Sequence, residues 1–339
     1  MNDLINQDDA LNLDSSIRPG SFNEFVGQND IVNNLQIFIK AAQMRSEPLD
    51  HILFSGPPGL GKTTLARIIA SLQHGEFRQV SAPNLKRTGD VVKILSGLSR
   101  NDTLFIDEIH RLTTPVEEVL YSAMEDRQVD ITLSDGLGAM PIQLDLPPFT
   151  LVGATTRPGN LTAPFRDRFG IHLRLDYYSE SEIEEILKNA AKKWDIRYEN
   201  DALEEVARRS RKTPRVSLRL LRRIWDYAIA DNNLENAVID KAIVESGFYQ
   251  MQIDMLGLTA LDNRFLRVIA ENFQGGPVGL KPLSAALSED VVTLEDFVEP
   301  YMIRLDLVHR TSRGRVITRK GYGHINMPQP VSGQRLLYE

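Results

Sequence analysis

Several features that mark other classes of protein are missing from this chain of 339 residues. It contains no cysteine, which excludes disulfide bonds, thiolate catalysis and cysteine-ligated zinc. No stretch approaches the roughly 20 consecutive apolar residues that a helix needs to cross a bilayer. Residues 1–14 are polar and acidic and have neither the basic nor the apolar region of a secretory signal peptide. We therefore expect a cytoplasmic protein that does not act at membranes.

An excess of basic charge is missing as well, because the formal net charge is −7. This balance argues against nonspecific binding of nucleic acid by the whole chain, but it is compatible with a local basic face. Hydrophobic residues make up 42% and charged residues 25%, which is typical of globular domains. The length suffices for two or three domains.

The most informative stretch is a glycine-rich loop at 56–64, with the sequence G-P-P-G-L-G-K-T-T. It follows an apolar run at 51–54 that predicts a buried strand, and it precedes a helical spacing of apolar residues at 65–72. In this setting the pattern is typical of a phosphate-binding loop. We expect Lys62 to reach the β- and γ-phosphates of a nucleotide and Thr63 to place its hydroxyl on Mg²⁺.

Acidic and hydroxyl side chains end two later apolar strands. The strand at 103–106 leads into Asp107 and Glu108, and the strand at 149–154 leads into Thr155. Asp107 is expected to orient Mg²⁺ and its waters, and Glu108 to polarise the attacking water as a general base. Thr155 can help to position that water, or it can simply cap the strand.

Two arginine-containing stretches are candidates for contacts with phosphate. Arg166 and Arg168 flank an aspartate, which suits either an arginine that stabilises a phosphoryl-transfer transition state or a surface ion-pair cluster. Arg215 begins a long helix among other basic residues. It can contact nucleotide across a helical lid, or the whole group can form a solvated face.

The order of the elements predicts three domains. Strands alternate with helices up to residue 176, which indicates an α/β fold with a parallel sheet and a ligand at the carboxyl ends of its strands. Alternating residues near 130–146 predict a hairpin within it. A helical stretch follows, for which Ser179 and Glu182 form a plausible capping box.

Three later helices and a basic hairpin give a winged-helix pattern. Arg310, Arg313 and Arg315 lie in or beside that hairpin, where they can contact DNA phosphates or form an ordinary charged wing. The expected boundaries are a disordered N-terminus at 1–16, a large ATPase domain at 17–176, a helical lid at 177–254, a winged-helix DNA-binding domain at 255–325 and a tail at 326–339.

Taken in order, these motifs resemble the AAA+ ATPases and, among them, the RuvB family of bacterial Holliday-junction branch-migration motors. The segments that carry the resemblance are 56–64, 105–112, 149–157, 168–171 and 275–280. The resemblance implies a homohexameric ring that encircles double-stranded DNA at Holliday junctions and pulls it by hydrolysing ATP with Mg²⁺, in recombination and repair. It also implies two partners, the resolvase RuvC and the junction-binding RuvA, which would dock on the hairpin near 130–146 through Ile142 and Leu144.

The same resemblance assigns roles to individual residues. Arg168 corresponds to an arginine finger acting in trans, Arg215 to the lid sensor and Thr155 to the sensor on the strand. The expected nucleotide contacts are Ile17, Arg18, Gly59, Leu60, Gly61, Lys62, Thr63, Thr64, Glu125, Asp126, Arg127, Arg168, Tyr178 and Arg215.

Two other classes share parts of this pattern. A clamp-loader subunit typically carries a Ser-Arg-Cys finger motif, whereas this chain has no cysteine. A nucleotide-switched DNA regulator with a winged helix would not need the activating carboxylate of Glu108. His110, which follows that carboxylate, is expected only to pack or to form local hydrogen bonds.

Overall fold

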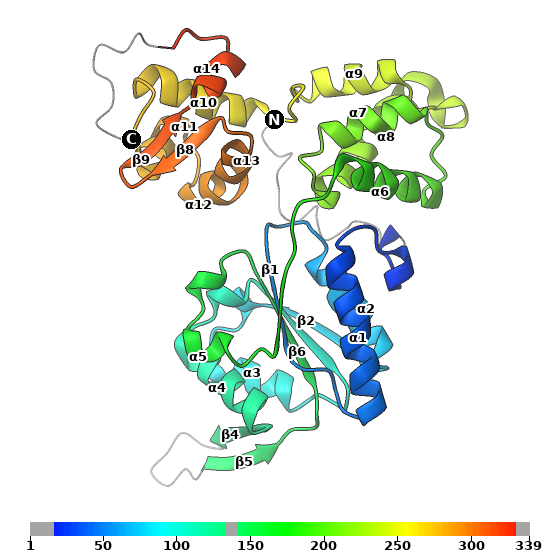
Figure 1. Cartoon of the computed structure of the whole chain (residues 1–339), viewed down its shortest axis with the longest axis vertical. Coiled ribbons are helices and arrows are strands. Elements are labelled where there is room, and N and C mark those ends of the chain that lie inside the picture. The colour runs from blue at the N-terminus through cyan, green and yellow to red at the C-terminus, as the bar shows by residue number, and fades with distance from the viewer. Residues whose placement is uncertain (1–16, 133–140, 330–339) are drawn as a thin grey trace. The chain divides into compact units, whose positions relative to one another are not determined.

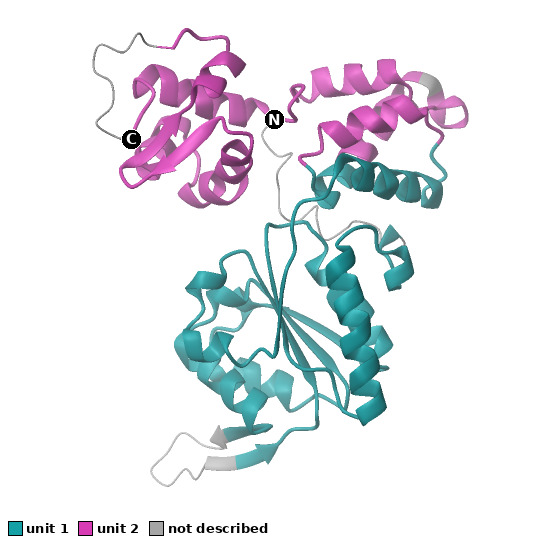
Figure 2. Cartoon of the chain, in the orientation of Figure 1, with its two compact units in different colours: residues 1–196, 212–219 teal, residues 197–211, 220–339 magenta. Residues whose placement is uncertain are grey.

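The computed structural model of the chain describes residues 17–132 and 141–329. The segment 1–16, which we expect to be disordered, lies outside these residues, as does most of the expected tail. The chain divides into two compact units, which are coloured separately in Figure 2. Unit 1 comprises 1–196 and 212–219, and unit 2 comprises 197–211 and 220–339.

A five-stranded sheet forms the centre of unit 1 (Figure 1). Its strand order is β2-β3-β6-β1-β7, and every neighbouring pair is parallel. The strands are β1 Ile52–Ser55, β2 Phe77–Ser81, β3 Thr103–Asp107, β6 Thr150–Thr155 and β7 Ile171–Arg174. This confirms the predicted α/β class with a parallel sheet. It also places the ends of β1, β3 and β6 side by side at one edge.

Helices cover both faces of this sheet (Figure 1). One face carries α1 Asn29–Arg45 and α2 Lys62–Leu72, and the other carries α3 Thr88–Leu95, α4 Thr114–Glu125 and α5 Ala163–Arg166. A short 3₁₀ turn, η4 Phe22–Glu24, precedes α1, and others lie between later elements at η5 Ala82–Asn84, η6 Ile109–Arg111 and η7 Pro158–Asn160. Because both faces are covered, β6 is buried along its whole length, as expected of a central parallel strand.

The predicted hairpin is present, and in chain order it lies between α4 and β6. It consists of β4 Gln128–Thr132 and β5 Pro141–Asp145, which pair antiparallel. The residues between the strands, 133–140, lie outside the described part. Val129 is buried in the core on which α3 and α4 pack, and Leu144 is partly buried against the same core.

The helical stretch after the sheet begins at α6 Glu180–Lys193 and continues with α7 Asn200–Arg208, α8 Pro214–Asn236 and α9 Lys241–Gln250. The predicted capping box is confirmed, since the Ser179 hydroxyl accepts the Glu182 N–H and the Glu182 carboxylate accepts the Ser179 N–H. From the sequence alone we expect the last of these helices to cover 237–247, but this predicted start is wrong. Asp240 caps that helix by accepting the Ile243 N–H, so it begins four residues later.

A compact winged helix follows in unit 2. Its helical elements are α10 Ala260–Asn272, α11 Leu280–Leu287, α12 Val291–Thr293, a π-helical turn η8 Leu294–Val298, α13 Glu299–Arg304 and α14 Arg319–His324. The hairpin consists of β8 Val308–Thr311 and β9 Gly314–Ile317. From the sequence alone we expect the two strands at 305–308 and 315–318, but the first strand begins later, because the Leu305 N–H still bonds the Tyr301 carbonyl at the end of α13. None of the helices in the described parts combines the length and apolar character needed to span a membrane.

Candidate functional site

The glycine-rich loop after β1 takes a conformation that only glycine tolerates easily. Gly56 has a φ of 131°, and a Cβ there would lie 2.4 Å from the Leu175 carbonyl oxygen. Gly59 has a φ of 80°, and a Cβ there would lie 2.8 Å from the Cβ of Arg215. Left-handed backbone and close packing together require these glycines.

The donors that this loop can offer to an anion are concentrated at one end. Pro57 and Pro58 have no N–H, so the free amides come from Gly59 onward. The helix α2 begins at Lys62, three residues earlier than the apolar spacing predicts, because Leu65 already bonds the Gly61 carbonyl. The first turn of α2 therefore points unsatisfied N–H groups and the positive end of its dipole into the loop, which suits phosphate.

Lys62 is buried within the loop, with a side chain that is held by two carbonyl groups. Its Nζ donates to the carbonyl oxygens of Gly56, at 2.8 Å, and of Pro57, at 2.7 Å. Burial lowers the pKa of Lys62 to about 8, a shift that the charges of Asp107 and Glu108 oppose. An incoming anionic phosphate would offer this ammonium a stronger partner than a neutral carbonyl.

The two carboxylates lie where β3 ends. Asp107 accepts the N–H of Glu108 at 3.0 Å, and Glu108 has left-handed backbone angles, with φ of 52° and ψ of 39°. A residue other than glycine in this conformation costs on the order of 1–3 kcal/mol, and such strain occurs in turns and in active sites alike. Glu108 is also the residue that precedes the 3₁₀ turn Ile109–Arg111, so the chain leaves the strand direction at this carboxylate.

The oxygen groups of Thr63 and Asp107 suit Mg²⁺ by their chemistry. A hydroxyl and a carboxylate are hard ligands, and Mg²⁺ usually keeps several waters and takes further ligands from the substrate phosphates. Within 17–132 and 141–329 no group of three or more histidine or carboxylate side chains is arranged to hold a metal by itself. The chain thus offers a site for an ion that arrives with a nucleotide rather than a closed metal cage.

The structure gives His110 a position that the sequence did not reveal. Thr155, at the end of β6, is fully buried, and its hydroxyl lies 2.9 Å from Nδ1 of His110. Nε2 of the same ring lies 3.4 Å from the carboxylate of Glu108. The local hydrogen bond expected for His110 is therefore present, but it joins two of the predicted catalytic residues.

Predicted nucleotide contacts from distant parts of unit 1 gather around the loop. The Tyr178 hydroxyl donates to the Leu60 carbonyl at 3.0 Å, and burial raises the pKa of this phenol. The N–H of Arg215 donates to the Gly59 carbonyl at 3.3 Å, with its side chain exposed. Phe25, which we did not predict, lies where a Cβ on Gly61 would contact it at 2.9 Å.

The two N-terminal candidates differ in their surroundings. Ile17 is buried, whereas Arg18 is half-buried and its positive charge acts on Arg215. The last loop residue, Thr64, lies in the first turn of α2 and is half-buried. Most of the predicted contacts thus lie around one loop.

Arg168 is instead joined to helix α4. Its guanidinium forms an ion pair with Glu125 at 2.6 Å, hydrogen-bonds the Tyr121 hydroxyl and lies 4.5 Å from the centre of the Tyr121 ring. Asp126 and Arg127 follow Glu125 and are exposed. The structure therefore groups Arg168 with Glu125, Asp126 and Arg127, a second group of predicted contacts.

Several other arginines near the lid have acidic partners that lie elsewhere in the sequence. Arg209 is buried, pairs with Glu205 and donates two hydrogen bonds to Glu245 at 3.0 Å. Arg211 pairs with the buried Asp262. Arg209 and Arg211 therefore take part in internal ion pairs and do not belong to a solvated basic face.

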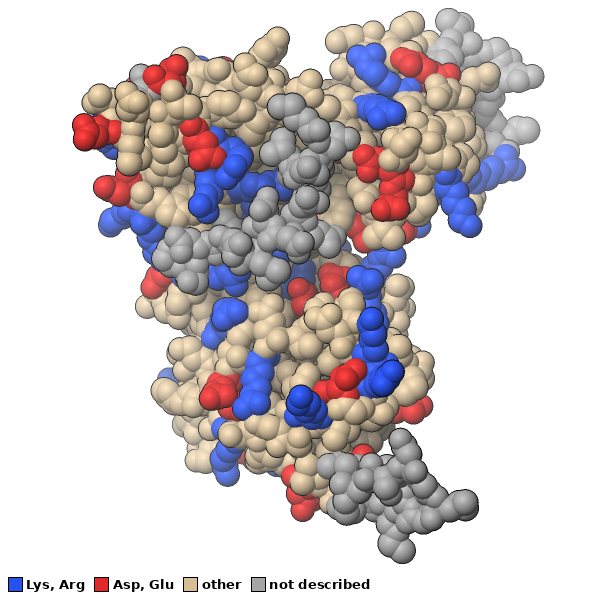
Figure 3. Space-filling view, turned by 180° about the vertical axis from the view of Figure 1, so that it is seen from behind, with Lys and Arg blue, Asp and Glu red and all other residues tan. Residues whose placement is uncertain are grey.

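The wing arginines divide into one buried and two exposed residues. Arg315 is buried and donates to both oxygens of Glu299, at 3.1 and 2.8 Å. The side chain of Arg310 is 58% exposed, and Arg313 is exposed at the turn. Over the face drawn in Figure 3, basic and acidic groups are interspersed. A contact with DNA would thus be local, with Arg310 and Arg313 better placed for it than Arg315.

The structure describes the two hairpin residues that we expect to bind a partner to different extents. Ile142 pairs with Ile131 in the ladder, but its side chain lies outside the described part. Leu144 is half-buried against the core of unit 1, which leaves only part of its side chain for a partner.

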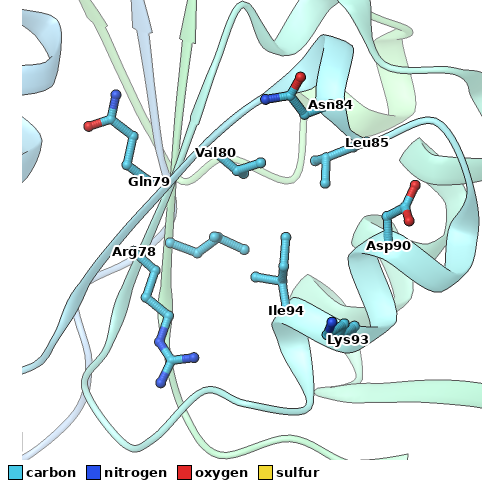
Figure 4. A pocket seen from close by; sticks show the side chains of 9 residues that line it. Arg78, Gln79, Val80, Asn84, Leu85, Asp90, Lys93 and Ile94 are labelled. Carbon is cyan, nitrogen blue, oxygen red and sulfur yellow. The ribbon is translucent and has the colours of Figure 1, made fainter. Parts of the chain in front are cut away.

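A cavity of about 440 Å³ lies elsewhere in unit 1, between β2 and α3 (Figure 4). Val80, Leu85 and Ile94 converge on its interior, and the charged Arg78 and Lys93 lie at its margin. It contains none of the residues predicted to bind nucleotide. The chemistry of the loop therefore does not depend on this cavity.

The fold and the loop together define a class. A parallel sheet of this order, a phosphate loop after β1, an acidic pair after β3, an arginine at the start of a lid helix and a winged helix make an AAA+ ATPase with a DNA-binding type of domain. Family comparisons agree along nearly the whole chain. Residues 17–175 match the Holliday junction DNA helicase RuvB P-loop domain, 178–254 the RuvB AAA lid domain and 255–326 the RuvB C-terminal winged helix domain. The chain belongs to the RuvB family.

Individual relatives are similar over the same length. The Holliday junction branch migration complex subunit RuvB of Rickettsia africae is 50% identical over 314 residues, 93% of this chain and 91% of its own length. The corresponding subunit of Paramagnetospirillum magneticum is 48% identical over 315 residues, 93% and 90% of the two chains. The solved structure of the Thermotoga maritima RuvB Holliday junction branch migration motor matches with a TM-score of 0.84 and 44% identity, covering 93% of this chain and all of that one. The clamp-loader and DNA-regulator alternatives are therefore set aside.

Proposed function

We infer that this chain is an ATP-hydrolysing motor that drives the branch migration of Holliday junctions. One observation supports this most strongly: the phosphate loop, the Asp107–Glu108 pair and Arg215 are assembled on one AAA+ unit in a chain that also carries a winged helix. The first three serve nucleotide hydrolysis, and the last is a common means of holding DNA.

At the nucleotide, the loop amides and Lys62 hold the phosphates, Ile17 and Arg18 contact the adenine side, and Tyr178 makes a further nucleotide contact. Glu108 accepts the proton of the attacking water as a general base. A bound Mg²⁺, held by Thr63 and Asp107, would neutralise charge on the phosphate oxygens. Arg215, at the start of the lid helix, senses whether ATP or ADP is bound.

The second group of residues completes the site of another subunit. Arg168 is turned toward α4 of its own chain, which suits an arginine finger that acts on a neighbour. Glu125, Asp126 and Arg127 lie on the same surface and would face the same neighbouring nucleotide. This arrangement needs an oligomer, and we propose a homohexameric ring around double-stranded DNA.

Other parts of the chain bind DNA and partner proteins. Arg310 and Arg313 hold DNA phosphates, RuvA docks on the β4–β5 hairpin through Ile142 and Leu144, and RuvC acts on the same junction. The protein works in the cytoplasm. The ATPase domain would extend over 17–176, the lid over 177–254 and the winged helix over 255–325.

The test is an ATPase assay of the purified chain alone, with duplex DNA, and with duplex DNA plus the junction-binding partner. We expect basal hydrolysis that rises with DNA and rises further with both. Equal hydrolysis under all three conditions would contradict a DNA motor. The Lys62→Ala variant, which lacks the phosphate-binding ammonium, is the matched control for contaminating ATPases.

A further inference from the structure

One histidine lies between two strand ends at the centre of the ATPase site. β3 and β6 are parallel neighbours, and their carboxyl ends lead into Glu108 and carry Thr155. The 3₁₀ turn Ile109–Arg111 is closed by a hydrogen bond from the Arg111 N–H to the Glu108 carbonyl, at 2.8 Å. This turn brings His110 back over the gap between the two ends, where the side chain is only 8% exposed.

We assign the position of the His110 proton from the two contacts of its ring. Thr155 Oγ1 accepts the N–H of Arg157 at 2.9 Å, and we place its own hydroxyl proton toward Nδ1 of His110, which lies at the same distance. A neutral imidazole that accepts at Nδ1 carries its proton on Nε2. Nε2 is the atom that faces the carboxylate of Glu108 at 3.4 Å. The tautomer assigned in this way makes His110 a donor to the general base.

A line of polar contacts continues from His110 and Thr155 to the phosphate loop through the backbone. The Thr155 carbonyl accepts the N–H of Gly56 at 3.2 Å, and the Gly56 carbonyl accepts the Lys62 ammonium at 2.8 Å. The line thus runs from Lys62 through Gly56, Thr155 and His110 to Glu108. Each link is a polar contact between groups that are buried or half-buried, where such contacts are stronger than in water.

We propose that His110 is a positioning residue that orients the carboxylate of Glu108 and couples it to Thr155 and the phosphate loop. The proposal rests on the ATPase function inferred above and deepens it. When phosphate takes Lys62 from the Gly56 carbonyl, the change at the loop is transmitted along this line to the base. The left-handed backbone of Glu108 supports the same role, because a strained turn holds a side chain in a direction that a relaxed strand end would not give.

The experiment compares variants that keep different parts of the ring. His110→Gln keeps a donor near the Nε2 position, His110→Asn keeps one only near Nδ1, and His110→Phe keeps the bulk without either nitrogen. Since general-base catalysis contributes about 10²–10⁴ in rate and His110 only orients the base, we expect His110→Phe to lower kcat about 10- to 100-fold and to change KM less than about twofold. His110→Asn should be nearly as slow, while His110→Gln should recover most of kcat. The matched control is His172→Phe, at an exposed position on β7, which should behave like the wild type.

A double-mutant cycle separates positioning from packing. If His110 and Thr155 act as one unit, the variant with both His110→Phe and Thr155→Val should be no slower than the slower single variant. Added to Glu108→Gln, His110→Phe should cause no further loss. Independent, multiplying losses in both cycles would overturn the proposal, because they would mean that the ring stabilises the fold rather than the base.

Three measurements distinguish a failure of the role of His110 from a failure of the proposed ATPase function. A wild-type chain that does not hydrolyse ATP contradicts the proposed function itself. A hydrolysing wild type with an unchanged kcat in His110→Phe, or with a change in KM alone, overturns the role of His110 and leaves the function standing. Thermal unfolding and ADP affinity check that each variant is folded. If His110→Phe does not fold, equal kcat values for the Asn and Gln variants would overturn the proposal.

Discussion

Arg168 is paired with Glu125 of its own chain, with 2.6 Å between the guanidinium nitrogen and the carboxylate oxygen. The Tyr121 ring lies under the same guanidinium, 4.5 Å from its centre to the arginine carbon. One turn of α4 therefore holds the arginine from two sides while 36% of its side chain stays exposed. An arginine that is ordered in advance loses less conformational freedom when it meets a phosphate.

From this arrangement we predict the effect of removing the arginine. Arginine fingers contribute about 10³–10⁵ in rate in GTPase systems, so Arg168→Ala should lower kcat for ATP by about 10³-fold or more. Affinity for ADP, measured by titration, should stay close to that of the wild type. Arg166→Ala is the control, since Arg166 is a nearby, partly exposed arginine that pairs with Asp167. A loss below about tenfold in Arg168→Ala, or an equal loss in Arg166→Ala, would contradict the finger.

A mixing experiment tests whether the finger acts on a neighbouring subunit. Arg168→Ala subunits keep an intact loop, and Lys62→Ala subunits keep an intact finger. Mixed oligomers should therefore recover part of the ATPase activity that each variant lacks alone. No recovery, in oligomers whose mixed composition is verified by mass spectrometry, would count against action in trans.

The depressed pKa of Lys62 gives a pH dependence of nucleotide binding. Burial holds the pKa of Lys62 at about 8 in the free protein, and a bound phosphate would raise it. The free state then loses its proton first as the pH rises, so ADP affinity should be constant below about pH 8 and fall by up to about tenfold per pH unit above it. Isothermal titration of Lys62→Arg is the control, because a guanidinium stays charged in this range. The same fall in both proteins would show that another group titrates.

The buried ion pair in the winged helix predicts a loss of stability rather than of DNA affinity alone. Glu299→Ala would leave the buried Arg315 without its carboxylate, and breaking such pairs costs about 3–5 kcal/mol. Chemical unfolding followed by circular dichroism should show this loss in the transition of the winged helix. Glu295→Ala is the matched control, since Glu295 lies 3.7 Å from the exposed Arg310 and should cost less than about 1 kcal/mol. A Glu299→Ala protein as stable as the control would show that the pair contributes little.

The exposed wing arginines predict a different signature. Each phosphate contact contributes about 0.9 to the slope of log affinity against log salt, so Arg310→Ala and Arg313→Ala should each reduce that slope by about 1. Duplex binding at several salt concentrations, measured by fluorescence anisotropy, would give the slopes. Arg100→Ala, at an exposed arginine of the ATPase unit, should leave the slope unchanged. Unchanged slopes in both wing variants would show that other residues contact the DNA.

Much of the site could be predicted because its signals are local in the sequence. The loop at 56–64 and the Asp107–Glu108 pair each adjoin an apolar strand, and parallel strands bring their carboxyl ends together. The hairpin and the capping box at Ser179 follow from alternation and from the spacing of two residues. The α/β fold with a parallel sheet could therefore be predicted from the sequence.

What could not be predicted depends on contacts between distant residues. Arg315 and Arg310 look equivalent in the sequence, and only the packing of α13 beside the hairpin shows that Glu299 binds the buried Arg315 through both oxygens while the exposed Arg310 lies 4.0 Å from it. The role of His110 arises from the distance between two strand ends, which no local pattern encodes. The start of α2 at Lys62 was missed because a loop glycine caps it, so that the helix begins before its apolar spacing does.

Branch migration itself tests the central claim most directly. The assay uses a synthetic four-way junction with homologous arms, the purified chain, the junction-binding partner, Mg²⁺ and ATP. We predict that the wild type converts the junction to duplex products only when ATP is hydrolysed, and that Glu108→Gln, which retains nucleotide binding, yields none. Conversion by Glu108→Gln at the wild-type rate, or no conversion by a wild type that hydrolyses ATP in the same mixture, would contradict the account.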